Sequence, residues 1–565
     1  MQALRWLATL VLAAPAVAQW NPPAAQWGKT DAADLRVMSW NVLDTICSTN
    51  AKTEGNNNWT ACARVVAALK PDVLFITEAG DNSGNGTGSG VDGTTALNNT
   101  IQYFLHGGND QYHSNTPVTA YVQKYAPGYD LPYVFVSTVS DGFNRNVVLS
   151  RFPFADQNGD GKSTLSDIPN VSATAWAPGG TGGIRGFQFT EIDLPNATYL
   201  GDFVFGGAHL KAGSQSSDHT DRIEAAQNVS YFMRYWYNGN GGGTPDPSGK
   251  INDSPVATSV LDAVTPIVIV GDWNEDEQTN GTKGPAEWLS FAQTAGGTSD
   301  GTDADGTDMT YDAALNYFNL SRATYQSGAK LDYVAWQDSV ASLRLATIFN
   351  SGATPSGSMP PELVGFSGGT TLVSSKASDH FPVIVDLELP IVDCNQNGVA
   401  DTSDIVLGTS LDLNANGIPD ECECAAPIVY CTSKFNSLLC QPAIASSGSP
   451  SASSPAPFLI TATQLLNKKN GLLFYGHQPN GAAFQGGHLC VKLPIVRTAV
   501  QFSGGSSTGS DCSGAYSYDF NALIQGGGDP TLVVGATLYA QYWARDPQDV
   551  FTTSLSDGLQ FTICN

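Results

Sequence analysis

The stretch Pro266-Ile267-Val268-Ile269-Val270-Gly271-Asp272-Trp273-Asn274-Glu275-Asp276 decides the fold of the chain. Four consecutive β-branched residues between a proline and a glycine predict a fully buried strand. Side chains two positions apart in an extended segment share a face, so we expect Asp272 and Asn274 to lie together at the end of this strand. A carboxylate and a carboxamide in that position can bind a hard cation, or hold a water and a phosphate oxygen together. The same residues are common at an ordinary strand–turn junction, so this stretch alone leaves both interpretations open.

Other predicted strands also end beside polar residues. Each of three further apolar segments is followed by one: 35–40 by Asn41, 73–76 by Glu78 and 203–208 by His209. Periodicity predicts more strands over 132–137, 146–150, 187–192, 330–336 and 383–389, and helices over 59–69, 97–105 and 218–237. Strands and helices interleave, but several strands are linked as hairpins. The sequence therefore predicts a mixed α/β sandwich rather than a purely parallel sheet, closing near Pro390.

The start of the chain has the features of an export signal. Residues 1–18 combine a short basic start, an apolar run and a small-residue end, which predicts a secretory signal peptide before a Pro/Ala-rich lead-in over 19–33. Ten cysteines, an even number, fit an oxidised exported protein, and Cys47 and Cys62 are close enough in sequence to pair. No later apolar run reaches the roughly 18 residues that a membrane span needs. We therefore expect a secreted protein, either extracellular or held at the cell surface.

Length and charge limit the functions that the chain can have. At 565 residues it is long enough for several domains. Its formal net charge of −26 argues against nonspecific adhesion to nucleic acid or anionic lipid through a broad basic face. A phosphate-binding site is not excluded. Charges more than about 8 Å apart are largely screened by salt, and a bound divalent cation makes the local electrostatic potential positive.

Eight polar residues at or beside the predicted strand ends form one chemical inventory: Asn41, Glu78, His209, Asp272, Asn274, Asp332, Asp379 and His380. Carboxylates and amides bind a hard Mg²⁺ or Mn²⁺, imidazoles transfer protons, and a carboxylate can orient an imidazole. Each residue alone has an ordinary explanation, because a single buried histidine is usually a core residue and a single aspartate usually forms a cap or a turn. Together they predict metal-assisted attack of water on a phosphorus centre.

These residues lie in an ordered series of motifs that resembles the endonuclease/exonuclease/phosphatase superfamily, which has the deoxyribonuclease I-like fold. The motifs are Ser39-Trp40-Asn41, Pro71-Asp72-Val73-Leu74-Phe75-Ile76-Thr77-Glu78, Asn146-Val147-Val148-Leu149-Ser150-Arg151-Phe152-Pro153, Ala208-His209-Leu210, Gly271-Asp272-Trp273-Asn274, Leu331-Asp332-Tyr333 and Ser378-Asp379-His380-Phe381-Pro382-Val383. The resemblance implies an α/β (α+β) fold, a four-layer α/β/β/α sandwich, over residues 34–392. Long polar loops over 80–117, 238–255 and 296–312 depart from the common pattern, so the substrate is not carried over with the fold.

The resemblance also implies which residues hold the metal and the phosphate. Glu78 is the expected principal ligand of Mg²⁺ or Mn²⁺, with Asn41 and Asp379 beside it. Asp272 and Asn274 are expected to position the attacking water and the scissile phosphate.

Proton handling is implied for the two histidines. His380 is expected to act as general base or to stabilise the transition state, and His209 to assist at the leaving oxygen. Asp332 is expected to orient one of the two imidazoles, without a preference between them. The run Asn144-Arg145-Asn146 either faces the phosphate, as substrate-binding residues would, or has a structural role in its loop.

Three loops have the donor spacing of EF-hand calcium loops, with oxygen donors at alternate positions and a glycine at the sixth. The donors are Asp156, Asn158, Asp160 and Asp167 in the first loop, Asp393, Asn395, Asn397, Asp401 and Asp404 in the second, and Asp412, Asn414, Asn416, Asp420 and Glu423 in the third. The second and third loops start 19 residues apart and resemble dockerin-type or thrombospondin-type calcium repeats. They predict a Ca²⁺-stiffened connector over 393–423, with docking to a cohesin-like partner as the less favoured alternative and a solvated Asp/Asn turn as the ordinary one.

The last part of the chain, residues 424–565, is Gly/Ser-rich with short β-like runs and predicts a separate, disulfide-stapled all-β domain. It is similar to cysteine-containing C-terminal modules of secreted bacterial proteins, and its role is not indicated by any catalytic grouping. Exposed aromatics could form a surface-binding strip, although core packing explains them equally well.

The favoured function is a secreted, Mg²⁺-dependent phosphodiesterase, an extracellular nuclease acting on DNA or RNA. A phospholipase C of sphingomyelinase type or a phosphomonoesterase would share the same hydrolytic residues. A calcium-dependent adhesion protein without activity is disfavoured, because every expected catalytic position is filled.

Overall fold

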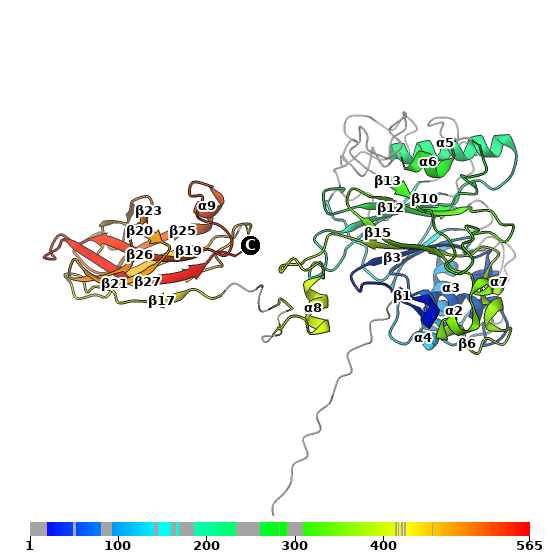
Figure 1. Cartoon of the computed structure of the whole chain (residues 1–565), viewed down its shortest axis with the longest axis horizontal. Helices are drawn as coiled ribbons and strands as arrows, with labels where there is room; N and C mark the ends of the chain where they lie inside the picture. The colour runs from blue at the N-terminus through cyan, green and yellow to red at the C-terminus, as the bar shows by residue number, and fades with distance from the viewer. Residues whose placement is uncertain are drawn as a thin grey trace, which may run out of the picture. The chain divides into compact units, whose positions relative to one another are not determined.

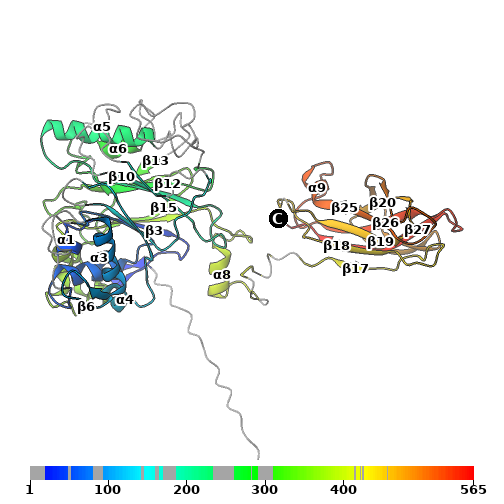
Figure 2. The same ribbon diagram turned by 180° about the vertical axis from the view of Figure 1, so that it is seen from behind.

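The computed structural model describes residues 20–48, 52–80, 93–140, 145–159, 165–168, 186–232, 260–281, 283–290, 309–412, 415, 417–419, 422, 425–454 and 456–564. Several positions singled out above lie outside these residues, namely the predicted signal peptide, Asn144, Asp160, Asn414, Asn416, Asp420 and Glu423. The chain divides into two compact units, residues 1–410 and 411–565. Figures 1 and 2 show each unit from two sides. Within the described residues, no helix is long and apolar enough to cross a bilayer.

The first unit contains two six-stranded sheets. In the first sheet the strands lie in the order β13 (Met309–Tyr311), β14 (Asp332–Gln337), β12 (Ile267–Asp272), β11 (Phe203–Ala208), β10 (Phe187–Ile192) and β9 (Leu165–Ile168). Strands β11 and β12 run parallel, and the other neighbouring pairs are antiparallel. Every residue of β12 is buried, because this central strand is covered on both faces.

The second sheet has the order β15 (Ser342–Ile348), β16 (Val383–Glu388), β3 (Leu35–Asn41), β4 (Val73–Thr77), β8 (Val147–Ser150) and β7 (Tyr133–Val136). Strands β3 and β4 run parallel, and their neighbours are antiparallel. The predicted mixed α/β fold is therefore confirmed.

Three groups of buried apolar side chains hold the sheets and helices together. One lies between the two sheets and includes Val37 and Phe75 of the second sheet with Phe205 and Val268 of the first. Another joins the second sheet to α2 (Asn58–Leu69), α3 (Thr94–His106), α4 (Tyr121–Tyr125) and α7 (Val373–Ala377). The third joins the first sheet to α5 (Ser216–Phe232) and α6 (Pro285–Leu289). Figure 1 shows α5 and α6 above the two sheets and α2, α3 and α4 below them.

Shorter elements of this unit include β1 (Trp20–Asn21), β2 (Gln26–Trp27), α1 (Thr45–Ser48), β5 (Gly108–Asp110) and β6 (Thr116–Val118). Helix α2 carries Cys62, and its buried, free thiol donates to the carbonyl oxygen of Ala377 in α7 at 3.5 Å. The expected bridge between Cys47 and Cys62 is therefore not formed, because Cys62 faces α7.

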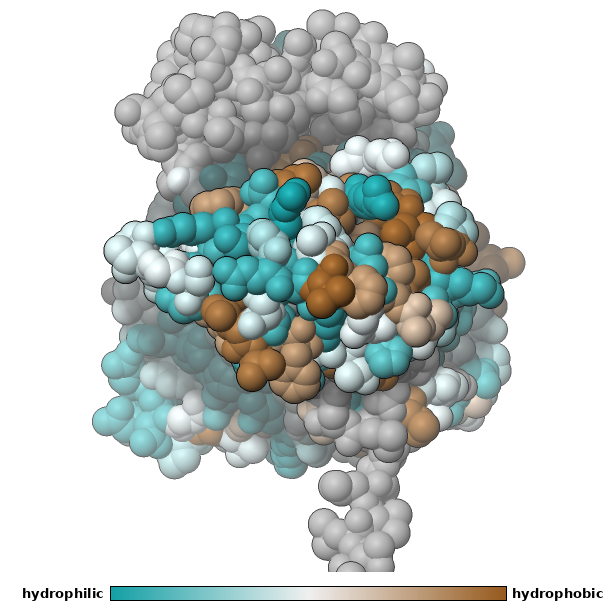
Figure 3. All heavy atoms as spheres, turned by 90° about the vertical axis from the view of Figure 1, so that its left-hand side faces the viewer, coloured by the Kyte–Doolittle hydropathy of each residue, from teal (hydrophilic) through white to brown (hydrophobic). Residues whose placement is uncertain are grey.

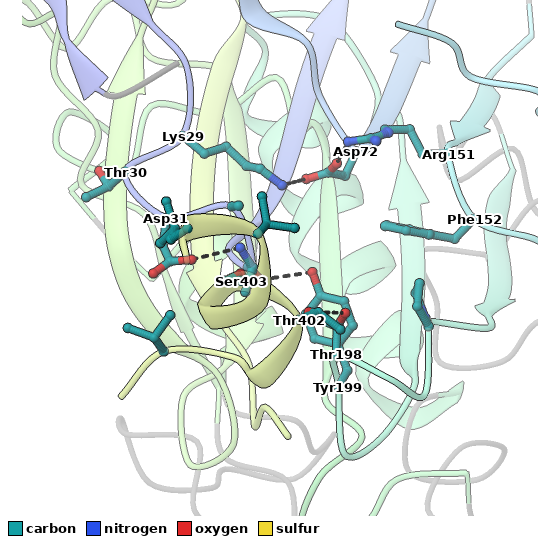
Figure 4. Close-up of a pocket in the computed structure, with 16 residues that line it drawn as sticks. Lys29, Thr30, Asp31, Asp72, Arg151, Phe152, Thr198, Tyr199, Thr402 and Ser403 are labelled. Atoms are coloured by element: carbon teal, nitrogen blue, oxygen red, sulfur yellow. Dashed lines mark hydrogen bonds and ion pairs between the residues drawn. The ribbon is translucent and has the colours of Figure 1, made fainter. Parts of the chain in front are cut away.

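Helix α8 (Asp401–Leu407) packs against the first unit near the edge where strands β3 and β4 begin. Its Thr402 hydroxyl hydrogen-bonds to the Thr198 hydroxyl at 3.1 Å, and the Val392 amide donates to the Thr198 carbonyl at 2.9 Å. A cavity of about 380 Å³ lies between α8 and the sheets, and Figure 4 shows Lys29, Asp72 and Arg151 on its inner wall. None of the eight predicted catalytic and metal-binding residues lines this cavity.

The second unit consists mainly of β-strands. Its larger sheet has the order β17 (Ile428–Tyr430), β27 (Thr553–Thr562), β26 (Thr537–Arg545), β20 (Asn470–Gly476) and β23 (Val496–Arg497), with β24 (Gln501–Phe502) beside β20. Three further strands form a second sheet, β18 (Ala443–Ser447), β19 (Leu459–Leu465) and β25 (Gly514–Asp519), followed by α9 (Phe520–Gln525). Strands β21 (Pro479–Phe484) and β22 (Gly487–Val491) form a hairpin. The disulfides Cys431–Cys490 and Cys440–Cys512 cross-link the unit, and Cys564 is also disulfide-bonded.

Candidate active site

The sheet topology brings the predicted strand ends to one edge. Strands β3 and β4 are parallel, so Asn41 and Glu78 emerge together at their carboxyl ends. Strands β11 and β12 are parallel in the other sheet, so His209 and Asp272 emerge together there. The antiparallel strands β14 and β16 begin at this edge and contribute the residues at or before their first positions. Asp332 is directly opposite Asp272 in the register, and His380 lies three residues before Val383.

Asn41 links the two sheets at this edge. Its Nδ2 donates to Asp272 Oδ2 at 2.9 Å and to Glu78 Oε1 at 3.1 Å. The Nε2 atom of His209 lies 3.5 Å from Asp272 Oδ2 and 3.7 Å from Glu78 Oε1. Asn41, Glu78, His209 and Asp272, which end or follow four different strands, therefore form one cluster.

His380 faces the same carboxylate from the other side. Its Nδ1 lies 2.7 Å from Asp332 Oδ2, and its Nε2 lies 3.8 Å from Asp272 Oδ2. The other oxygen of Asp332, Oδ1, is buried and has no hydrogen-bond partner among the described residues. Of the two imidazoles, Asp332 therefore orients His380 in this structure. This contact fixes the ring so that Nε2 points to Asp272.

The backbone at this edge is held in unusual conformations. Glu78 and Asn274 have φ angles of 55° and 53°, in the left-handed region that few non-glycine residues adopt. The Asn274 amide donates to Asp272 Oδ1 at 3.0 Å, and its Nδ2 donates to the Leu210 carbonyl at 3.0 Å. Gly271 cannot be replaced easily, because a Cβ there would lie 1.7 Å from the Ala208 carbonyl oxygen. Such local strain is typical of functional sites.

Burial and charge change the acidity of the central groups. Burial, with the Asp332 carboxylate next in size, raises the pKa of Asp272 to about 7. Burial alone would lower the pKa of His380, but the Asp332 and Asp272 carboxylates raise it to about 10. No Lys or Arg forms an ion pair with Asp272 or Asp332 within the described part of the chain. The excess of buried negative charge is an arrangement that a cation would relieve.

At this edge, two groups of described side chains have ligand atoms close enough to share a metal ion. Glu78, His209 and Asp272 form one, and Asp272, Asp332 and His380 form the other, with all ligand atoms of each group within 4.8 Å of one another. Only the first contains Glu78, the predicted principal ligand. In this structure the Asn41 oxygen accepts from the Leu43 amide at 2.9 Å, and its amide nitrogen faces the two carboxylates.

The remaining predicted site residues lie further from this cluster. The half-buried Asp379 belongs to neither metal-capable group of described residues, although its charge acts on His380. Asn146 is buried and donates from Nδ2 to Gln188 Oε1 at 2.9 Å, which joins the two sheets. Arg145 donates to the carbonyl oxygens of Ser137 and Thr138 at 3.2 and 2.7 Å. Roles for Arg145 and Asn146 at the phosphate therefore stay predictions, and Asn144 lies outside the described residues.

Two residues that sequence reasoning did not assign have a clear place in the site. The Ser378 hydroxyl donates to the Asn41 carbonyl at 2.7 Å and accepts from the His380 amide at 3.0 Å, so it fixes His380 against β3. Its position at the start of the Ser378-Asp379-His380 motif was the signal for it. The Tyr325 ring centroid lies 4.8 Å from that of His380, and no motif indicates it.

The two tandem calcium-type loops begin with the same local turn. Asp393 Oδ2 accepts from the Gly398 amide at 2.8 Å, and Asp412 Oδ2 accepts from the Gly417 amide at 2.8 Å. The two glycines have φ angles of 84° and 86°, which favour glycine. In both loops the first-position carboxylate therefore accepts a hydrogen bond from the sixth-position glycine.

The other donors of the second and first loops are only partly described. Asn395 and Asn397 both donate to Asp404 Oδ2, at 3.3 and 2.8 Å, so their side chains meet inside the second loop. In the first loop Asp156 Oδ1 accepts from the Gly159 amide at 3.0 Å. Asn158 lies beside this turn and Asp167 in β9, and Asp160 is outside the described residues.

The chain has structural neighbours among solved proteins. An endonuclease/exonuclease/phosphatase from Beutenbergia cavernae is 15% identical, with 93% of this chain and 99% of that chain covered and a TM-score of 0.35. The human Nocturnin catalytic domain is 14% identical, covering 64% and 96%, with a TM-score of 0.33. Sphingomyelinase C from Streptomyces griseocarneus is 13% identical, covering 62% and 99%, with a TM-score of 0.31. No family model matches the sequence, and no curated protein matches it.

Proposed function

We propose that this protein is a secreted phosphodiesterase that hydrolyses P–O bonds with water and a divalent cation, Mg²⁺ or Mn²⁺. The observation that carries the proposal is the meeting of Asn41, Glu78, His209, Asp272, Asp332 and His380 at one edge of the two six-stranded sheets. These residues come from six separate segments. The fold alone does not require these residue types at this edge, because each strand could end on any polar residue.

The donor set fits a hard cation. The carboxylates of Asp272 and Asp332 are buried and form no ion pair with a Lys or Arg among the described residues, and burial raises the pKa of Asp272 to about 7. Glu78 is the proposed principal ligand, with Asn41 and Asp379 beside it. When bound, the cation would polarise the phosphate and stabilise the charge that develops on it.

Asp272 and Asn274 are proposed to hold the attacking water and the phosphate. Asp272 Oδ2 is close to Nε2 of both histidines, at 3.5 Å for His209 and 3.8 Å for His380. A water hydrogen-bonded to this carboxylate is therefore within reach of both imidazoles. Asn274 would donate to a phosphate oxygen once its hydrogen bond to the Leu210 carbonyl opens.

His380 and His209 are proposed to handle the charge and the proton. The Asp332 carboxylate holds Nδ1 of His380 at 2.7 Å, and the two neighbouring carboxylates keep this imidazole protonated at neutral pH. A protonated His380 stabilises the extra negative charge of the pentacovalent transition state. His209, fully buried beside Glu78, would assist at the leaving oxygen.

Nucleic acid is the proposed substrate. Tyr325 lies beside His380 and is half-buried, so part of its ring is open to a ligand that reaches the site. Aromatic rings at such positions stack with bases and accept different sequences. The disulfides of the second unit support an oxidising, extracellular location, where the predicted signal peptide would direct the protein.

One experiment tests the proposal and separates its alternatives. The purified protein is incubated with Mg²⁺ and, in parallel, plasmid DNA, RNA, sphingomyelin and a phosphomonoester, each with an EDTA control. We expect EDTA-sensitive cleavage of nucleic acid by the wild-type protein and none by Asp272→Asn. If only sphingomyelin or only the monoester were cleaved, the assignment as a phosphoesterase would hold and the assignment as a nuclease would be wrong. No metal-dependent hydrolysis of any substrate would overturn the enzyme itself.

The calcium-type loops are proposed to bind Ca²⁺ and to stiffen the connector over 393–423. The shared carboxylate-to-glycine turns of Asp393 and Asp412 support this. We expect Ca²⁺ to raise the melting temperature of the wild-type protein, and to raise it less in Asp393→Ala. An unchanged response in Asp393→Ala combined with Asp412→Ala would contradict calcium binding at these loops.

A further inference from the structure

The larger sheet of the second unit is apolar on both faces. On one face, Leu473 and Tyr475 of β20 pack with Tyr542 of β26 in the core of the unit. Alternate residues of the same strands point the other way, because successive side chains of a strand face opposite sides. Leu472 and Trp543, which are direct neighbours in the register, lie on this second face.

The β21–β22 hairpin covers only part of the second face. At one end it is tied to β26, because Gln541 accepts from the Cys490 amide at 3.0 Å and donates to the His488 carbonyl at 3.0 Å. The disulfide Cys431–Cys490 holds the same end. At the other end, the hairpin turn at Gly486 and Gly487 lies beside Lys434 and Phe551. A cavity of about 420 Å³, in the range of small-ligand pockets, is lined by residues of both the hairpin and the sheet.

The walls of this cavity are mostly apolar and aromatic. Leu472, Phe474 and Trp543 form its floor, and Phe484 and Leu493 form its rim, where 37% and 67% of their surfaces are exposed. Figure 3 looks onto this unit and shows apolar side chains, in brown, gathered among polar ones on its surface. Apolar groups left open in this way are typical of ligand and partner sites.

Two polar groups in the lining have no partner within the unit. Arg497 is register-paired with Phe474, so its side chain is on the cavity side, and it forms no ion pair with any described residue. The chain has 52 Asp and Glu residues against 26 Lys and Arg, so acidic partners are abundant. The Oε1 atom of Gln485 is buried with no hydrogen-bond partner among the residues that the structure describes. Buried polar atoms without partners are rare and call for an explanation.

We propose that this cavity binds a small amphiphile with one apolar chain or ring and one anionic head group. The apolar part would lie on Trp543 and Phe474, and the anionic group would pair with the Arg497 guanidinium. Gln485 would accept a hydrogen bond from a hydroxyl or amide next to that head. The unpaired cation in a strongly acidic chain selects an anionic ligand over a neutral or cationic one of the same shape.

The test uses three soluble probes with the same ten-carbon chain, below their micelle concentrations: decanoate, decanol and decyltrimethylammonium. Binding to the full-length protein is followed by calorimetry and by the fluorescence change of Trp543 relative to a Trp543→Phe variant. We expect saturable one-to-one binding of decanoate, weaker binding of decanol and none of the cation. A hydrogen bond to a charged group contributes about tenfold or more in affinity. Arg497→Gln should therefore weaken the binding of decanoate by at least about that factor and leave the binding of decanol unchanged.

Arg545→Gln is the matched control, because Arg545 is an exposed cation of β26 that does not line the cavity. It should bind decanoate like the wild type, and both variants should keep the wild-type melting temperature. Equal binding of all three probes, or an unchanged decanoate affinity in Arg497→Gln, would overturn the proposal. So would adsorption to anionic vesicles without any binding of decanoate monomers, which would assign the face to a membrane surface.

Discussion

Asp72 and Asp272 are both buried carboxylates at strand ends, with 0% and 1% of their surfaces exposed, but they have opposite surroundings. Asp72 precedes β4 at the edge next to α8, where Lys29, Arg151 and the Arg36 amide all donate to it at 2.7 to 2.8 Å. Asp272 ends β12 at the edge where Glu78 follows β4. It has a carboxamide, two imidazoles and another carboxylate around it, and no Lys or Arg among the described residues.

The acidity of the two groups follows from this difference. Burial raises the pKa of Asp72, but the Lys29 and Arg151 charges outweigh burial, and the pKa lies below its ordinary value. At Asp272 nothing outweighs burial and the Asp332 charge, and the pKa rises to about 7. A buried carboxylate with its own cations belongs to the structure. One that is buried without them costs stability, and a ligand or a reaction must explain why it is there.

The largest expected effect is on catalysis at Asp272. Replacing it by Asn should lower phosphodiester turnover by about 10³-fold or more, because the water and the phosphate lose the group that positions them. The measurement is kcat/KM for a chromogenic phosphodiester with Mg²⁺. Asp72→Asn is the matched control and should keep near-wild-type turnover per folded molecule. Equal losses in the two variants would mean that Asp272 has no special role.

The next effect concerns His380 and Asp332. His380→Ala should lower turnover by about 10²- to 10³-fold, the usual loss when one group that stabilises the charge of the transition state is removed. Asp332→Asn should give a similar loss, since it frees Nδ1 of the ring, and the double variant should lose little more than either single one. Additive losses would show that the two residues act separately.

For the free energy of unfolding, Asp72 should matter more than Asp272. Asp72→Asn should lower the free energy of unfolding by about 2 to 3 kcal/mol, at the low end for a broken buried pair because Lys29 and Arg151 are partly exposed to solvent. Asp272→Asn in the metal-free protein should be neutral or stabilising, because it removes a buried charge without a Lys or Arg partner. Urea denaturation in EDTA measures both. A strongly destabilised Asp272→Asn would contradict the assignment of this residue to function.

The pH dependence of stability should have opposite signs at the two sites. The folded pKa of Asp72 is below its unfolded value of about 3.9, so its contribution is present above that pH and is lost as the pH falls through the folded pKa. The folded pKa of Asp272 is about 7, so the metal-free folded state binds the extra proton between about pH 4 and 7, and its stability falls as the pH rises. His380, with a folded pKa of about 10 against about 6.5 unfolded, continues this fall up to about pH 10.

Melting curves in EDTA between pH 4 and 9 test this smaller effect. We expect Asp272→Asn to flatten the fall between about pH 4 and 7, and Asp72→Asn to leave it as it is. If the melting temperature of Asp272→Asn fell with pH as steeply as that of the wild type, a group other than Asp272 would be responsible for the fall.

Much of the site follows from the sequence because polar residues beside apolar runs mark strand ends. Asn41, Glu78, His209 and Asp272 are recognisable in this way, and the parallel pairs β3–β4 and β11–β12 explain why they meet. The pairing of β3 with β16 spans nearly the whole first unit, and no local pattern encodes it. Strand β15 was not expected, because an edge strand with exposed residues lacks a continuous apolar run.

Side-chain partners are harder to predict than strand ends. The choice of Asp332 for His380 rather than His209 depends on the register of β12 with β14, which places Asp332 opposite Asp272. The place of Tyr325 beside His380 depends on a bridge between two irregular segments. Neither feature can be predicted from the periodicity of apolar and polar residues in the sequence.

A crystal grown with Mn²⁺ would test the central claim most directly. The anomalous difference map should show a peak within coordination distance of Glu78, and this peak should be missing in Glu78→Gln. Mn²⁺ found only at the loop that begins at Asp393, or at no position beside Glu78, would contradict the account.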